Sequence, residues 1–142
     1  MHISSKVLLF SSSTFLISSY YGYHIQNSLY KIDLMSTIFS ILYWYDSENK
    51  YKRMMDIAFA NIAGVSFFVY GVYNMNDNMK YVAWCNLVGI LSNFSLSCIY
   101  YKMKYDKWFY FHFLFHMFTL CNKLIIYNYW LTLYNENVLL QM

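Results

Sequence analysis

Two histidines, His112 and His116, stand four residues apart in the apolar and aromatic stretch FYFHFLFHMFTL. A spacing of i and i+4 places both imidazole rings on the same side of a helix, one turn apart. Two imidazoles in that arrangement can bind one zinc ion, with nitrogen–zinc distances of about 2.0–2.1 Å. The alternative is that both rings pack as polar aromatic side chains hydrogen-bonded to neighbouring helices. The pair alone leaves both interpretations open.

The helix that would carry the histidines belongs to a chain with few charges. Of 142 residues, 59% are hydrophobic and only 12% are charged, whereas about a quarter are charged in soluble domains. The mean hydropathy is +0.29. A soluble domain of this size needs more polar surface, so the composition predicts an integral membrane protein. An AT-rich genome would explain the excess of Tyr, Asn, Lys, Ile and Met, but not the confinement of charges to short clusters.

The charge clusters divide the chain into apolar segments, and a helix of about 20 residues crosses a bilayer. The sequence therefore predicts an all-α fold, a polytopic membrane helix bundle of about five transmembrane helices, forming a single integral membrane domain over residues 1–142. The predicted spans are residues 7–23, 30–45, 57–73, 81–101 and 108–122, the last of which could extend to 134. The first segment could instead be a secretory signal. Bulky tyrosines follow it where a cleavage site needs small residues, so an uncleaved span is expected.

The basic residues of a five-span chain gather on one side of the membrane. The amino terminus and two loops carry seven of the ten: Lys6, Lys50, Lys52, Arg53, Lys102, Lys104 and Lys107. The opposite side carries Lys31 and Lys80, and Lys123 is not assigned to either side. Since cytoplasmic loops are enriched in Lys and Arg, the amino terminus is predicted to be cytoplasmic.

Several other features of the sequence are assigned structural roles. The net charge of +3 is too small and scattered for a nucleic-acid-binding face, so no nucleic acid partner is expected. The three cysteines (Cys85, Cys98 and Cys121) lack the spacing of a disulfide framework or zinc knuckle and are expected to be small buried side chains. Asparagines within the spans (Asn61, Asn86 and Asn93) are expected to join helices by hydrogen bonds, and Gly64 and Gly71 to permit close helix approach.

Polar residues from two other spans are predicted at the depth of the histidine pair. Asp56 opens the span 57–73, and Ser40 lies near the end of the span 30–45 that faces the same side. Ionisable side chains within a membrane span are expected to be functional. The common depth therefore favours a shared, cytoplasm-facing site.

The stretch SILYWYDSENKYKRMMDIAFANIAG, residues 40–64, resembles the region between the second and third spans of the CREST superfamily of membrane hydrolases. This superfamily includes alkaline ceramidases, the adiponectin and progestin receptor (PAQR) proteins and hemolysin III-like proteins. Ser40 matches the family serine, Asp56 the aspartate, and His112 with His116 the late HxxxH pair. In the family, three histidines bind zinc, and the aspartate holds a zinc-activated water that hydrolyses an amide in a lipid substrate.

The resemblance implies a zinc site at His112 and His116, with Ser40 and Asp56 as catalytic residues. With only two matching histidines, Asp56 could become a direct zinc ligand, as in other sites of two histidines and one carboxylate. The Ser40 hydroxyl would orient a ligand or stabilise an oxyanion, and zinc-bound water would attack a carbonyl. However, Trp44 stands where the family has its other histidine, and tryptophan cannot bind zinc. The chain also has fewer predicted spans than the family, and His24 is expected at the opposite face.

Three functions therefore stay open, and whether the protein is an enzyme stays open with them. The favoured one, because of Trp44, is a small multi-pass membrane protein without catalytic activity, or a diverged relative of membrane hydrolases. The alternative is a zinc-dependent intramembrane hydrolase of a lipid amide or ester. A subunit of an energy-transducing complex is the third; haem ligation between two helices would need a histidine on each, which disfavours a haem site. The lipid bilayer is the expected partner in each case.

Overall fold

The computed structural model describes residues 3–139, and this part of the chain is helical without a strand. Its elements are α1 (Ile3–Ser13), α2 (Phe15–His24), α3 (Leu29–Tyr45), α4 (Lys50–Ser66), the π-helix η1 (Phe67–Val72), α5 (Asp77–Lys102) and α6 (Trp108–Leu139). The predicted all-α class is confirmed.

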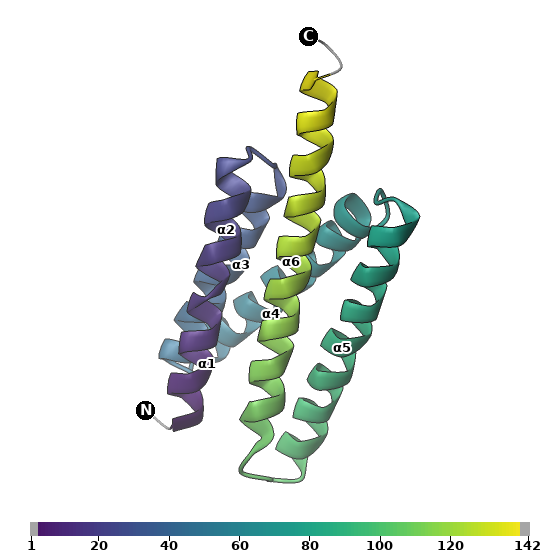
Figure 1. Cartoon of the computed structure of the whole chain (residues 1–142). Coiled ribbons are helices and arrows are strands. Elements are labelled where there is room, and N and C mark those ends of the chain that lie inside the picture. The colour runs from purple at the N-terminus through teal and green to yellow at the C-terminus, as the bar shows by residue number, and fades with distance from the viewer. Residues whose placement is uncertain (1–2, 140–142) are drawn as a thin grey trace.

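Helix α6 occupies the centre of the bundle (Figure 1). It packs against α1, α2, η1 and α5, whereas α4 packs mainly against α3. Figure 1 shows α1 and α2 following one another along one side, α5 along the other, and α4 crossing obliquely behind. The α3–α4 and α5–α6 turns lie at the end of the bundle where the described chain begins, and α6 ends at the opposite end. The start of α1, the α3–α4 turn and the α5–α6 turn therefore lie at the same end of the bundle.

Asparagine side chains cap three of the helices. Asn27 Oδ1 accepts a hydrogen bond from the Leu29 N–H at the start of α3. Asn49 accepts from two N–H groups at the start of α4, and Asn76 accepts from one at the start of α5. Because the first N–H groups of a helix lack intrahelical acceptors, such caps fix where each helix begins.

The break between α1 and α2 at Thr14 falls in a run of hydroxyl side chains. The hydroxyl groups of Ser11, Ser13 and Thr14 donate to the carbonyl oxygens of Leu8, Leu9 and Ser11, respectively. Such hydrogen bonds to the preceding turn bend helices. The Thr14 hydroxyl also gives the Ser11 carbonyl at the break a donor, which matters in an apolar medium.

Three helices of the described chain are long and apolar enough to cross a membrane: Lys50–Val72, Asp77–Lys102 and Trp108–Asn135. Their outer surfaces carry large apolar side chains, among them Val65, Val88 and Leu91. Apolar surface on this scale is typical of a face covered by lipid or by another protein. The chain is thus an integral membrane protein. The first two predicted spans correspond to shorter helices. The span 7–23 falls on α1 and α2, which have 11 and 10 residues, and the span 30–45 falls on α3, which has 17.

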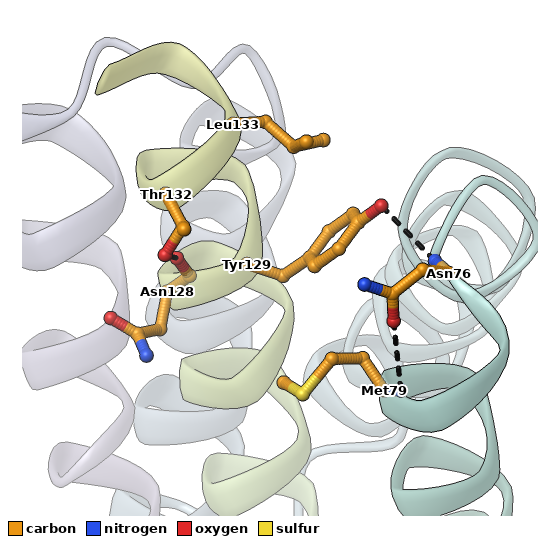
Figure 2. Close-up of a pocket in the computed structure, with 6 residues that line it drawn as sticks. All are labelled: Asn76, Met79, Asn128, Tyr129, Thr132 and Leu133. Atoms are coloured by element: carbon orange, nitrogen blue, oxygen red, sulfur yellow. Dashed lines mark hydrogen bonds between the residues drawn. The ribbon is translucent and has the colours of Figure 1, made fainter. Parts of the chain in front are cut away.

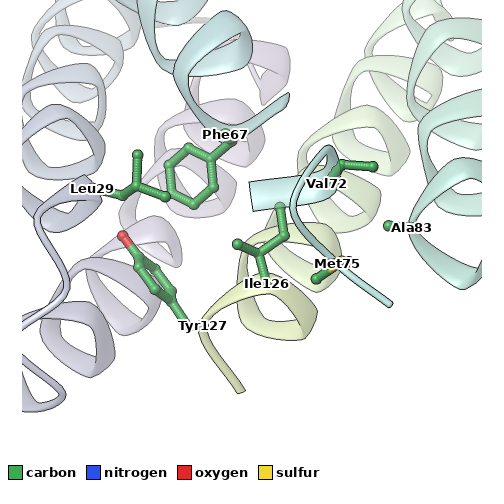
Figure 3. Packing of buried hydrophobic residues seen from close by; sticks show 7 residues of the cluster. All are labelled: Leu29, Phe67, Val72, Met75, Ala83, Ile126 and Tyr127. Atoms are coloured by element: carbon green, nitrogen blue, oxygen red, sulfur yellow. The ribbon is translucent and has the colours of Figure 1, made fainter. Parts of the chain in front are cut away.

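The interior combines an apolar cluster with many polar side chains. The cluster joins α3, η1, α5 and α6 and consists of Leu29, Phe67, Val72, Met75, Ala83, Ile126 and Tyr127 (Figure 3). The buried polar residues come mainly from α1, α2, α3 and α6, and include Ser11, Ser12, Ser18, Asp33, Thr37, Ser40, His116 and Lys123. Small hydroxyl residues at helix contacts let backbones approach closely in membranes.

The cysteines face outward, so the expectation that they are buried is wrong. Cys85, Cys98 and Cys121 are all exposed and unpaired among the described residues. Cysteine behaves as a small apolar side chain, so an outward position on an apolar membrane helix carries no desolvation cost. A pattern of apolar residues on all sides of a helix does not reveal which side is buried.

Glycines lie where other helices approach α6. A Cβ added at Gly71 would come within 2.7 Å of Ile126, whereas one at Gly64 would meet nothing within 4 Å. The expectation of a close approach therefore holds for Gly71 but not for Gly64. The two would share a face in a regular α-helix, but the wider turn of η1 lies between them and rotates Gly71 away.

This difference predicts opposite outcomes for two matched substitutions. Gly71→Val should lower the free energy of unfolding by roughly 1–3 kcal/mol, because the new side chain overpacks against Ile126. Gly64→Val should leave it nearly unchanged, because the space around Gly64 is open. Denaturant unfolding of the purified protein, diluted in detergent until it is monomeric, measures both, and equal effects would contradict this packing.

Candidate functional site

The two predicted histidines lie together on α6, and each is hydrogen-bonded to a serine of another helix. His116 is buried, and its Nδ1 lies 2.8 Å from Ser11 Oγ of α1. His112 Nδ1 lies 3.0 Å from Ser97 Oγ of α5. The ring centroids of the histidines are 4.9 Å apart. The structure thus confirms that both rings share one side of the helix, as the spacing predicted.

Trp44 packs against this pair. Its ring meets His112 edge-on, with 5.3 Å between the centroids, and it also contacts Trp108 at 6.3 Å. Trp44 is buried, and its Nε1 has no hydrogen-bond partner among the described residues. Trp44 therefore makes an aromatic contact with His112 and offers no metal ligand.

Ser40 and Asp56, the predicted catalytic residues, lie beside one another. Ser40 of α3 is buried, its Oγ is 3.0 Å from Ser12 Oγ of α1, and its hydroxyl faces the carboxyl group of Asp56 on α4. Ser12 follows Ser11 in sequence, and Ser11 bonds His116. Helix α1 thus contacts both predicted groups, the histidine pair and the Ser40–Asp56 pair.

These residues do not make a complete metal site. Within residues 3–139, no group of three or more His, Cys, Asp or Glu side chains is arranged to hold a metal ion. A zinc site normally takes at least three protein ligands, and the geometry offers the two imidazoles. Ligation of zinc by His112, His116 and Asp56 stays a prediction.

A buried ion pair was not anticipated from the sequence. The Lys123 ammonium of α6 donates to the Asp33 carboxylate of α3, and the side chains are 7% and 0% exposed. Asp33 also accepts a hydrogen bond from Ser18 Oγ of α2 at 2.8 Å and one from the Tyr127 hydroxyl at 3.4 Å. One carboxylate therefore connects α2, α3 and α6.

Aromatic rings enclose the ammonium end of this pair. Lys123 Nζ lies 4.2 Å from the ring centroid of Phe15 and 5.7 Å from that of Phe67. Cations are attracted to aromatic faces, more strongly where water is excluded. A signal was present in the sequence: Asp33 and Lys123 are charges of opposite sign inside or beside predicted spans, where an isolated charge is costly.

A shallow groove lies elsewhere, between the start of α5 and the second half of α6 (Figure 2). It is lined by Asn76, Met79, Asn128, Tyr129, Thr132 and Leu133. The Asn76 backbone N–H donates to the Tyr129 hydroxyl at 3.0 Å, and Asn76 Oδ1 caps α5 by accepting from the Met79 N–H. None of these six lining residues carries a carboxylate, imidazole or amine, and the Asn76–Tyr129 hydrogen bond joins the start of α5 to α6.

Comparison of the chain with protein-family models, with curated proteins and with solved structures finds no match. The resemblance to the CREST superfamily therefore rests on Ser40, Asp56, His112 and His116 alone.

The ion pair predicts a large effect of removing one partner. Lys123→Met should lower the free energy of unfolding in detergent by about 3–5 kcal/mol, because it leaves the buried Asp33 carboxylate without its cation. The matched control is Lys52→Met, which removes the partly exposed Lys52–Asp46 pair and should cost less than about 1 kcal/mol. Similar losses for both variants would contradict the assignment.

Proposed function

We propose that this chain is a small multi-pass membrane protein without catalytic activity, in which polar side chains join the helices. The observation that supports this most directly is that polar groups of the interior pair with one another. Ser11 bonds His116, Ser97 bonds His112 and Lys123 pairs with Asp33. Interhelical hydrogen bonds of this kind stabilise membrane bundles by about 0.6–2 kcal/mol each.

We also propose five crossings with the amino terminus in the cytoplasm. Helices α1 and α2 follow one another end to end (Figure 1) and would together make one crossing. Helix α3, α4 with η1, α5 and α6 would make the others. The α3–α4 and α5–α6 turns lie at the same end of the bundle. Basic residues follow the first turn at the start of α4 (Lys50, Lys52 and Arg53) and lie within the second (Lys104 and Lys107), and the positive-inside rule assigns such an end to the cytoplasm.

This topology predicts which positions a membrane-impermeant thiol reagent can reach. In a background with Cys85, Cys98 and Cys121 changed to Ser, Glu48→Cys and Asp106→Cys should react from the cytoplasmic side. Ser28→Cys, in the α2–α3 turn, and Asn78→Cys, in the first turn of α5, lie at the other end and should react only from the opposite side. Labelling of Glu48→Cys and Ser28→Cys from the same side would contradict five crossings.

A second function is supported by one specific feature of the histidine pair. Serine hydroxyls engage the Nδ1 atoms of both rings, which leaves both Nε2 atoms for another partner. Metal-binding histidines are usually oriented by such a hydrogen bond at the second ring nitrogen. This favours, as the alternative, a zinc-dependent hydrolase of a lipid amide or ester, with Asp56, His112 and His116 as ligands and Ser40 beside Asp56.

Metal analysis of the purified protein distinguishes the two functions. For a non-catalytic protein we expect zinc well below one equivalent per chain, and no change in that content on His116→Ala. His24→Ala is the matched control, since His24 is exposed at the end of α2. One equivalent of zinc that is lost in His116→Ala and kept in His24→Ala would overturn the non-catalytic proposal and support the hydrolase.

A further inference from the structure

Helix α4 presents an amide side chain on its outward face. Asn61 is exposed and lies near the middle of the membrane-spanning segment Lys50–Val72. Its Nδ2 donates to the Ile57 carbonyl oxygen of its own helix at 2.9 Å. Within the described chain, no other helix donates to it or accepts from it. The carbonyl oxygen and the second N–H of this amide therefore face the hydrocarbon region.

Asn86 differs from Asn61 in its hydrogen bond, and Asn93 differs from it in burial. Asn86 Nδ2 donates across to the Phe118 carbonyl oxygen of α6 at 3.3 Å, as expected for a residue that joins helices. Asn93 bonds the Gly89 carbonyl oxygen of its own helix and is half-buried. The expectation that a span asparagine joins two helices is thus met by Asn86 and is not met by Asn61 or Asn93 within the described chain.

The direction of Asn61 follows from the packing of α4. Phe59 stacks on Phe39 of α3 with 4.5 Å between ring centroids, and Ala63 is buried. Asn61 lies two residues from each of them, which places it on the opposite side of the helix. Because α4 packs mainly against α3, this opposite side has no partner among the described helices.

We propose that this face of α4 binds a second copy of the same chain, with the two Asn61 amides hydrogen-bonded across a two-fold axis. A carboxamide offers donors and an acceptor, so it is complementary to an identical carboxamide, as a two-fold interface requires. In a dimer, the carbonyl oxygen and the second N–H of each Asn61 amide find hydrogen-bond partners, which the hydrocarbon chains of lipid cannot provide. Acyl chains have no groups that could replace this partner.

The surface around Asn61 permits a close approach. Gly64 lies three residues further along the same face, and a Cβ there would meet nothing within 4 Å. Ile57, four residues before Asn61, is 50% exposed. A neighbouring α4 could therefore approach Gly64 closely while contacting the apolar side chain of Ile57. This accounts for a glycine beside which the described chain leaves open space.

Disulfide crosslinking in lipid vesicles tests the contact. In the background that lacks Cys85, Cys98 and Cys121, Gly64→Cys places a thiol on the proposed axis without a clash inside one chain. Val88→Cys on α5 is the control, since Val88 is also exposed and near the middle of its helix. Mild oxidation at a high lipid-to-protein ratio should give covalent dimers of Gly64→Cys only. No dimer, or equal dimer from Val88→Cys, would overturn the proposal.

The role of Asn61 is tested in the same vesicles. Asn61→Leu added to Gly64→Cys should weaken association about tenfold, the scale of one lost interhelical hydrogen bond. Asn93→Leu in the same background should leave dimer formation unchanged, because Asn93 bonds only its own helix. Circular dichroism and thermal unfolding of each variant check the fold. Undiminished crosslinking in a folded Asn61→Leu variant would contradict amide pairing.

Discussion

The pairing of Lys123 with Asp33 sets a constraint that the rest of the bundle must satisfy. Neither charge is exposed enough to be hydrated, and removal of a lone charge from water is far more costly than burial of a neutral side chain. The pair forms only when α6 turns its Lys123 side toward the start of α3. Ser18, Tyr127 and the ring of Phe15 then complete the surroundings of the two charges.

The orientation of α6 that makes this pair also places the histidines. His112, His116, Lys123 and Tyr127 follow at intervals of four, seven and four residues, so they share one side of the helix. With that side facing α1, α2 and α3, His116 meets Ser11, and Tyr127 packs against Gly22. The interior is thus more polar than the lipid-facing surface. Such an arrangement suits a medium in which burial of apolar groups provides little drive for helices to associate.

Part of this structure follows from the sequence alone. Apolar segments separated by charge clusters predict membrane helices, and the four-residue spacing of His112 and His116 predicts their common side. Trp44, one turn after Ser40, contacts His112, which agrees with the common depth expected for Ser40 and the histidines. The break at Thr14 and the π-helix η1 could not be predicted. Both depend on which groups donate hydrogen bonds to the backbone carbonyl oxygens. Periodicity also failed to distinguish Gly64 from Gly71, since η1 changes the rotation between them.

The central claim is that the Asp33–Lys123 pair, and not the polarity of each residue separately, holds α3 to α6. A double-mutant cycle of Asp33→Leu and Lys123→Met, measured by unfolding in detergent, tests it most directly. The claim predicts that the double variant is more stable than the sum of the single losses implies, by at least about 2 kcal/mol, since neither charge is then left unpaired. Additive losses within about 0.5 kcal/mol would contradict it.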